Sequence, residues 1–75
     1  MTNPDAFKAE VEALSPREYE VLALLAKGRL YKEIADQLGI GLGTVRTYQR
    51  RIYEKLHVQS RTEAAVKFLR MGSAS

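Results

Sequence analysis

The sequence predicts an all-α, compact domain of four helices. Apolar residues recur at the three- and four-residue spacing of amphipathic helices along most of the 75 residues. Glycines at positions 28, 39 and 41 interrupt this pattern where short helix connections are expected. No stretch of alternating apolar and polar residues is long enough to indicate a strand. A chain of this length has room for one domain with a small core.

The N-terminal residues 4–13 have helical composition and predict either a short leading helix or an ordered linker. Phe7, Val11 and Leu14 fall at helix-like spacing in and just after this segment. We therefore expect a leader at residues 1–13, a folded domain at residues 14–71 and a flexible tail at residues 72–75.

The first helix of the domain is predicted to begin at Pro16, because proline is favoured at the first helical position. Ser15 and Glu18 have the spacing of a capping box, in which each side chain accepts a hydrogen bond from the other residue's backbone. Gly28 provides the end of the helix. The apolar stripe between these signals consists of Val21, Leu22, Leu24 and Leu25.

A second helix is predicted at about residues 31–38, with Gly39 at its C-terminal end. Its inward side carries Ile34, Ala35 and Leu38. Leu30 stands where a serine or threonine cap would be expected. Since leucine has no side-chain acceptor, we expect it to fix the start of the helix through an apolar contact.

A third helix is predicted at about residues 42–56, with Gly41 as a weak cap. Gly43 lies in its first turn and costs about 1 kcal/mol relative to alanine. One side is apolar and is assigned to the core through Val45, Tyr48, Ile52 and Leu56. The opposite side carries Arg46, Thr47, Arg50 and Arg51.

The last helix is predicted to follow Ser60 and to end near Met71, because Ser60 and Glu63 repeat the capping-box spacing. It has more apolar residues than one buried side needs, so some serve either the core or a two-fold contact. These residues are Ala64, Ala65, Val66, Phe68 and Leu69.

The net charge of +3 is unevenly distributed along the chain. Residues 1–26 have two basic and five acidic residues, a net charge of −3, whereas residues 27–75 have ten basic and four acidic residues, a net charge of +6. The basic part contains the arginine-bearing third helix, as binding to phosphates would require.

Two short helices joined by a glycine-containing turn, with arginines along the second, are typical of a helix-turn-helix unit. Such a unit lays its second helix in the major groove of DNA. Arg46 and Arg50 are four residues apart and share one row of the helix, while Thr47 and Arg51 form the neighbouring row. The sequence therefore predicts a DNA-binding domain.

Several segments resemble the LuxR-type (GerE-like) helix-turn-helix domain, as in the output domains of NarL/FixJ-type response regulators of two-component systems. They are residues 14–22, 32–35, 38–40, 44–46 and 55–64, in the same order as in the family. The resemblance implies a four-helix domain of a bacterial transcription regulator. Its third helix would enter the major groove, and its fourth would form the dimer contact on an inverted repeat.

The resemblance also implies the roles of individual residues. The base-reading residues would be Arg46, Thr47 and Arg50. The phosphate contacts would be Lys32, Thr44, Gln49, Arg51 and Ser60, and the dimer contact would be formed by Ala65, Val66 and Leu69. The sequence departs from the family at Leu30 and Gly41, where hydroxyl residues are usual, and at Tyr48, where histidine is frequent.

Some residues keep two interpretations. Lys32 is either a phosphate contact or a surface lysine, and Tyr48 and Tyr53 either pack or stack on the DNA backbone. Glu20 either pairs with Arg61 or faces solvent. For the chain as a whole, the alternatives are a protein-interaction module, such as one that contacts RNA polymerase, and a fragment of polymerase sigma-factor region 4.

Other classes of function have little support. His57 is the only histidine and there is no cysteine, so no metal site, disulfide, cofactor or small-molecule ligand is expected. No base–nucleophile pair or phosphate-binding glycine loop indicates an enzyme. With neither a secretory signal nor a long apolar run, we expect a bacterial cytoplasmic protein that contacts double-stranded DNA at the nucleoid and no membrane.

Overall fold

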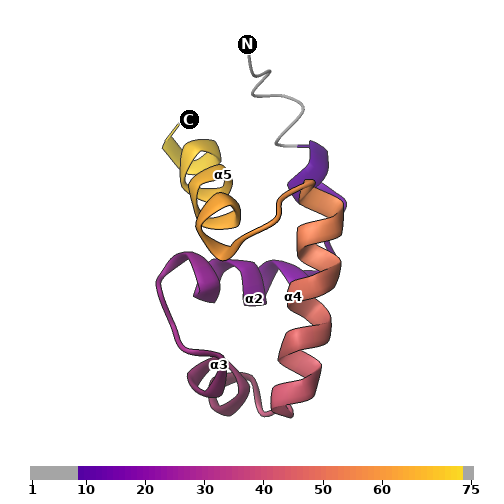
Figure 1. Ribbon diagram of the computed structural model, residues 1–75, viewed down its shortest axis with the longest axis vertical. Helices are drawn as coiled ribbons and strands as arrows, with labels where there is room; N and C mark the ends of the chain where they lie inside the picture. Colours follow the sequence, from indigo (N-terminus) through magenta and orange to yellow (C-terminus); the bar gives the residue numbers. More distant parts are fainter. Residues whose placement is uncertain (1–8, 74–75) are drawn as a thin grey trace.

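The computed structural model describes residues 9–73, with side chains described for residues 9–70, and this range is entirely helical apart from short connections (Figure 1). A helical turn at residues 9–12 is followed by α2 (Pro16–Ala26), α3 (Tyr31–Leu38), α4 (Leu42–Leu56) and α5 (Arg61–Ser73). The predicted all-α class and the order of the four helices are confirmed. Phe7, part of the predicted leader, lies outside the described residues.

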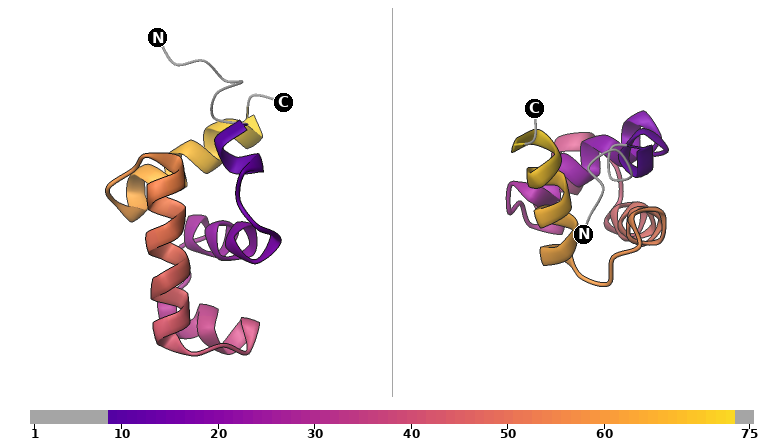
Figure 2. Two further views of the ribbon diagram at one scale, coloured as in Figure 1. Left: turned by 90° about the vertical axis from the view of Figure 1, so that its right-hand side faces the viewer. Right: turned by 90° about the horizontal axis from the view of Figure 1, so that it is seen from above.

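The longest helix, α4, runs along the long axis of the molecule, and α2 crosses it near its middle (Figures 1 and 2). The helix α3 lies at the N-terminal end of α4, whereas α5 and the turn at residues 9–12 lie towards the other end. The helix α2 packs against α3, α4 and α5, and α3 also packs against α4. The centre of the core is therefore α2, around which the other helices are arranged.

The core is formed by the apolar sides that the helical spacing predicts. Residues with no exposed surface come from every helix of the domain and are Val21, Leu22, Ile34, Val45, Ile52, Leu56 and Ala64. Val11 and Leu14 from the leading segment are also buried, with 5% and 8% of their surface exposed. The leading segment thus packs on the domain through two of the three apolar residues noted in the sequence.

The starts of α2 and α3 differ in how their backbone is satisfied. At α2 the predicted capping box is present: Ser15 N–H donates to Glu18 Oε1 at 2.8 Å, and Glu18 N–H donates to Ser15 Oγ at 3.1 Å. At α3 the predicted apolar contact of Leu30 is wrong, because 65% of this residue is exposed. Its backbone N–H instead donates to the Glu33 carboxylate at 2.8 Å, so half of a capping box remains without a capping side chain.

The start of α5 also follows the predicted cap, with one difference. Ser60 Oγ accepts from the Glu63 N–H at 3.2 Å, as expected. The Glu63 carboxylate accepts from the N–H of Gln59 at 3.0 Å rather than from that of Ser60. The helix continues to Ser73, two residues beyond the predicted end, so the first half of the expected tail is helical.

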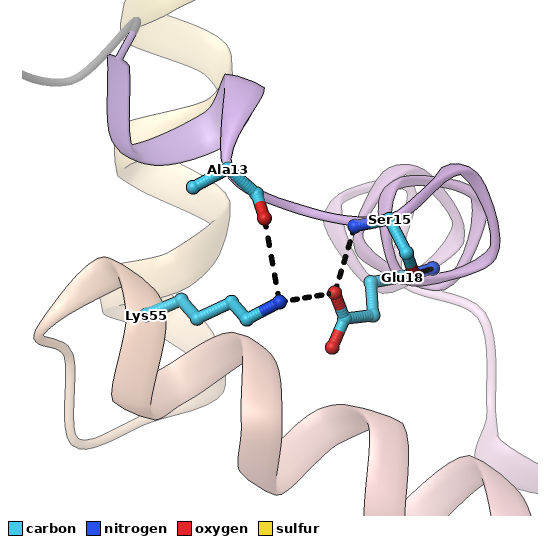
Figure 3. A network of polar contacts seen from close by, with 4 residues as sticks. All are labelled: Ala13, Ser15, Glu18 and Lys55. Carbon is cyan, nitrogen blue, oxygen red and sulfur yellow. Dashed lines mark hydrogen bonds and ion pairs between the residues drawn. The ribbon is translucent and has the colours of Figure 1, made fainter.

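A polar network joins the C-terminal end of α4 to the start of α2 (Figure 3). Lys55 Nζ donates to Glu18 Oε1 at 2.8 Å and to the Ala13 carbonyl at 3.3 Å. Burial of Glu18, which is 3% exposed, would raise its pKa. Hydrogen bonds from Lys55 and Ser15 outweigh this effect, so the pKa of Glu18 lies below its ordinary value of 4.5.

We expect the substitution Lys55→Met to lower the free energy of unfolding by about 2 kcal/mol, measured by urea denaturation at pH 7. Removing one partner leaves a buried carboxylate without its cation, which costs about 3–5 kcal/mol in a fully buried pair. The smaller value applies because 40% of the Lys55 side chain is exposed.

The pair of Arg17 and Glu20 provides the matched control, because it has a similar distance of 3.1 Å but both side chains are about half exposed. Glu20→Gln should change stability by less than about 0.5 kcal/mol. A lowered pKa means that the contribution of Glu18 is present above pH 4.5 and is lost as the pH falls through the folded-state value. The free energies of unfolding of Lys55→Met and of the natural chain should therefore approach each other below pH 4.5. A difference that stays constant with pH would contradict the role of the Lys55–Glu18 pair.

Candidate nucleic-acid interface

The two sides of α4 differ sharply in exposure and charge. Val45, Ile52 and Leu56 are completely buried. Arg46, Arg50 and Arg51 are exposed on the other side of the helix, as the sequence predicts. Because the helix turns by about 100° per residue, the burial of one row determines the direction of the others.

The three exposed arginines of α4 share this helix with a single carboxylate, that of Glu54. Within residues 9–70, none of their guanidinium groups takes part in an ion pair or a side-chain hydrogen bond. Like charges one helical turn apart repel one another, so three arginines on one helix are unfavourable when no anion is bound. An external anion is therefore the natural partner of this surface.

The side chain of Thr47 lies between the arginine rows and is half-buried. Its hydroxyl donates to the carbonyl of Gly43 one turn earlier, at 3.1 Å. The only hydroxyl proton is therefore used within the helix. What remains for an external partner is the methyl group and an oxygen lone pair.

A hollow of about 420 Å³ lies at the N-terminal half of α4 and is lined by Gly41, Gly43, Thr44, Thr47, Tyr48 and Arg51. It brings together two of the predicted phosphate contacts, Thr44 and Arg51, with the predicted base-reading residue Thr47. No side chain caps this helix end, since Gly41 is the N-cap. The backbone N–H groups of the first turn therefore add a favourable environment for an anion.

The other predicted phosphate contacts are not among the residues that line this hollow. Lys32 is exposed in the first turn of α3. Ser60 is exposed, and its oxygen already accepts the hydrogen bond that caps α5. Gln49 is half-buried and forms a hydrogen bond with Tyr53.

The tyrosines of α4 are packed rather than displayed. Tyr48 is half-buried against the core, which favours the packing interpretation, although it also lines the hollow. Tyr53 is half-buried and lies close enough to Tyr31 of α3 for the two phenols to interact. Burial and the neighbouring Tyr31 raise the pKa of Tyr53 to about 12, against the opposite effects of Gln49 and of the Arg61 charge. The phenol therefore stays protonated and links α3 to α4.

Arg61, at the first position of α5, holds the region where α2 ends and α3 begins. Its guanidinium donates to the carbonyl of Leu25 at 3.2 and 3.3 Å and also to that of Arg29. The same group lies over the ring of Tyr31, 5.9 Å from the centroid, within the range of a cation–π interaction.

This role of Arg61 is not predicted by the sequence. Of the two interpretations of Glu20, pairing with Arg61 is wrong, because Glu20 pairs with Arg17 on the surface. Carbonyl partners leave no signal in the sequence, because every residue has one.

The outer side of α5 exposes apolar surface at the positions predicted for a dimer contact. Val66 and Leu69 are 42% and 56% exposed, and Ala65 is half-buried. Ala64 belongs to the core instead, and Phe68 packs against Tyr19 with 5.6 Å between ring centroids. The apolar residues of this helix thus divide into a group that packs on the domain and a group that is exposed.

Residues 9–73 offer neither a membrane span nor a metal-ligating cluster. No helix in this part of the chain is long and apolar enough to cross a membrane. Across the same residues, no group of three or more histidine, cysteine, aspartate or glutamate side chains is arranged to hold a metal ion.

Residues 12–68 match a protein family described as "Bacterial regulatory proteins, luxR family". The chain is 49% identical over 59 residues to the transcriptional regulatory protein DesR of Bacillus subtilis, with 79% of the chain and 30% of DesR covered. It is 47% identical over 55 residues to the transcriptional regulatory protein LiaR of the same organism, which covers 73% of the chain and 26% of LiaR. With the response regulator protein VraR of Staphylococcus aureus it shares 43% identity over 67 residues, 88% of the chain and 32% of VraR. The chain therefore spans about a third of the length of these relatives.

We expect Arg61→Ala to lower the free energy of unfolding by about 2 kcal/mol, because two carbonyls lose their donor and the ring of Tyr31 loses its cation. Urea denaturation measures this change. Arg70→Ala removes the same charge from an exposed position of α5 and should change stability by less than about 0.5 kcal/mol. Equal effects of the two substitutions would show that Arg61 does not hold the helix junction.

Proposed function

Because the chain belongs to the luxR family of bacterial regulatory proteins, we propose that it is the sequence-specific DNA-binding domain of a transcriptional regulator. The relatives it matches are named as transcriptional regulatory or response regulator proteins. Its ligand is double-stranded DNA, with α4 as the recognition helix in the major groove. This ligand implies a site of action in the bacterial cytoplasm, at the nucleoid.

The observation that carries this proposal is the set of three exposed arginines on α4, none of which forms an ion pair within residues 9–70. They lie opposite the buried side of a helix that a short turn joins to α3. A helix of 15 residues is about 22 Å long and about 10 Å wide, which suits the major groove. Phosphates on both sides of the groove supply the missing negative charge.

The resemblance to the family assigns roles to individual residues. Arg46, Thr47 and Arg50 face the base edges, where an arginine binds guanine through two hydrogen bonds. Phosphates are contacted by Lys32, Thr44, Gln49, Arg51 and Ser60. For Arg51 and Thr44 the support is the hollow that they share beside the uncapped start of α4. For Gln49, Lys32 and Ser60 it is the resemblance of the sequence to the family.

The domain binds DNA as a dimer on an inverted repeat, through Ala65, Val66 and Leu69 on the outer side of α5. The support is the exposed apolar surface of Val66 and Leu69. One domain reads only a few base pairs, so two linked copies gain affinity through their effective concentration.

We expect Arg50→Ala to weaken binding to a selected duplex by about 5- to 150-fold, and to relax base preference at one position, because a bidentate contact to a base is lost. Arg51→Ala should weaken selected and random duplexes by a similar factor, because a phosphate contact carries no sequence information. It should also reduce the slope of log affinity against log salt by about one. Fluorescence anisotropy at several salt concentrations measures both effects.

Arg17→Ala is the control for total charge, since Arg17 is exposed at the start of α2. It should leave both base preference and affinity nearly unchanged. The absence of salt-dependent binding to any duplex would overturn the assignment of α4 to DNA.

We expect Leu69→Glu to abolish pairing on a duplex that carries two half-sites, because a charge would be buried in the contact between the two copies of α5. Affinity for a single half-site should stay within about twofold, since α5 lies towards the end of the molecule that is remote from the start of α4. Analytical ultracentrifugation of the protein–DNA complex measures the stoichiometry. One natural domain per two-site duplex at saturation would contradict the dimer.

A further inference from the structure

We propose that Leu42 is an additional base-reading residue, and that it contacts the C5-methyl group of a thymine in the major groove. The inference rests on the proposed function, because it requires α4 to lie in that groove. It adds a fourth residue to the three that are proposed to read bases, which are Arg46, Thr47 and Arg50.

The position of Leu42 places it in line with the arginines. It is the first residue of α4, and it precedes Arg46 and Arg50 by four and eight residues on the same row of the helix. In helix-turn-helix proteins, the N-terminal residues of the recognition helix are those that contact base edges. A side chain at this point has access to bases rather than to the sugar–phosphate backbone.

Within α4, Leu42 is exposed, whereas the other large apolar residues of the helix are buried or half-buried. It is 42% exposed and is absent from both the core and the partly buried residues that pack on it. The neighbouring apolar residues Leu38 and Ile40, by contrast, do pack on the core. The apolar surface of Leu42 is therefore available to a ligand.

The surroundings of Leu42 fit an apolar contact. The next residue is Gly43, and the space that its side chain would occupy is open, with nothing within 4 Å. Thr47 belongs to the neighbouring row, and its hydroxyl donates to the Gly43 carbonyl, which leaves its methyl group for a separate apolar contact. Thymine is the base whose major-groove edge carries a methyl group. The first turns of α4 thus match thymine, whereas Arg46 and Arg50 match guanine.

The test compares thymine with deoxyuridine, which lacks only this methyl group. Binding sites are first selected from random duplexes with the whole 75-residue chain, and each thymine of the selected site is then replaced singly by deoxyuridine. At one position the natural chain should lose affinity by about fourfold, the value expected for one buried methyl group. The Leu42→Ala variant should bind the thymine duplex more weakly than the natural chain, by a similar factor. For this variant, replacing that thymine by deoxyuridine should cause no further loss of affinity.

Leu30→Ala is the matched control, because Leu30 is 65% exposed but lies before α3 and outside α4. It should retain the full response to deoxyuridine. Natural protein that binds the selected site but tolerates every replacement would overturn the role of Leu42 and leave the proposed function intact. The same conclusion follows if Leu42→Ala keeps the response of the natural chain. Failure to bind any duplex would instead overturn the proposed function itself.

Discussion

The structure depends on the burial of one side of α4. Val45, Ile52 and Leu56 have no exposed surface and pack on a core centred on α2. Rotating α4 about its axis would expose these side chains, at a cost of about 1.5–3 kcal/mol for each of them. The direction of the arginines is therefore fixed by residues that never meet the ligand. Preorganisation of this kind means that little ordering is needed when the helix binds.

Polar contacts between the helices help to set the angles at which the helices pack, because a small apolar core leaves these angles poorly defined. Lys55 and Glu18 attach the C-terminal end of α4 to α2, and Tyr53 joins the same helix to Tyr31 of α3. Arg61 then ties Tyr31 to the end of α2 and to α5. Each contact joins elements that are distant in the sequence, so together they hold the helix-turn-helix unit against the rest of the domain. Hydrogen bonds have strict geometry, which apolar contacts lack.

Local signals in the sequence predicted the helices and their bounds. Contacts between residues that are distant in the sequence could not be predicted in this way. The bounds of α3 and α4 follow from helical spacing and from glycine, which at Gly39 adopts the positive φ of 66° that other residues avoid. The arginine side of α4 follows from the same spacing. Glu18 was predicted only as a cap, because its second partner lies 37 residues further along the chain. The start of α3 at Tyr31 was predicted correctly, but the apolar contact of Leu30 was wrong, because a leucine can precede a helix without packing when a glutamate in the first turn accepts from its backbone N–H.

The arrangement of the helices also keeps the two proposed contacts of the domain apart. The helix α5 lies towards the end of the molecule that is remote from the α3–α4 turn. A second copy docked on Val66 and Leu69 would therefore leave that turn and the start of α4 uncovered. Two-fold symmetry about such a contact carries the two recognition helices to separate sites with opposite directions, which corresponds to an inverted repeat. The same fold that directs the arginines outward is thus compatible with pairing and DNA binding at the same time.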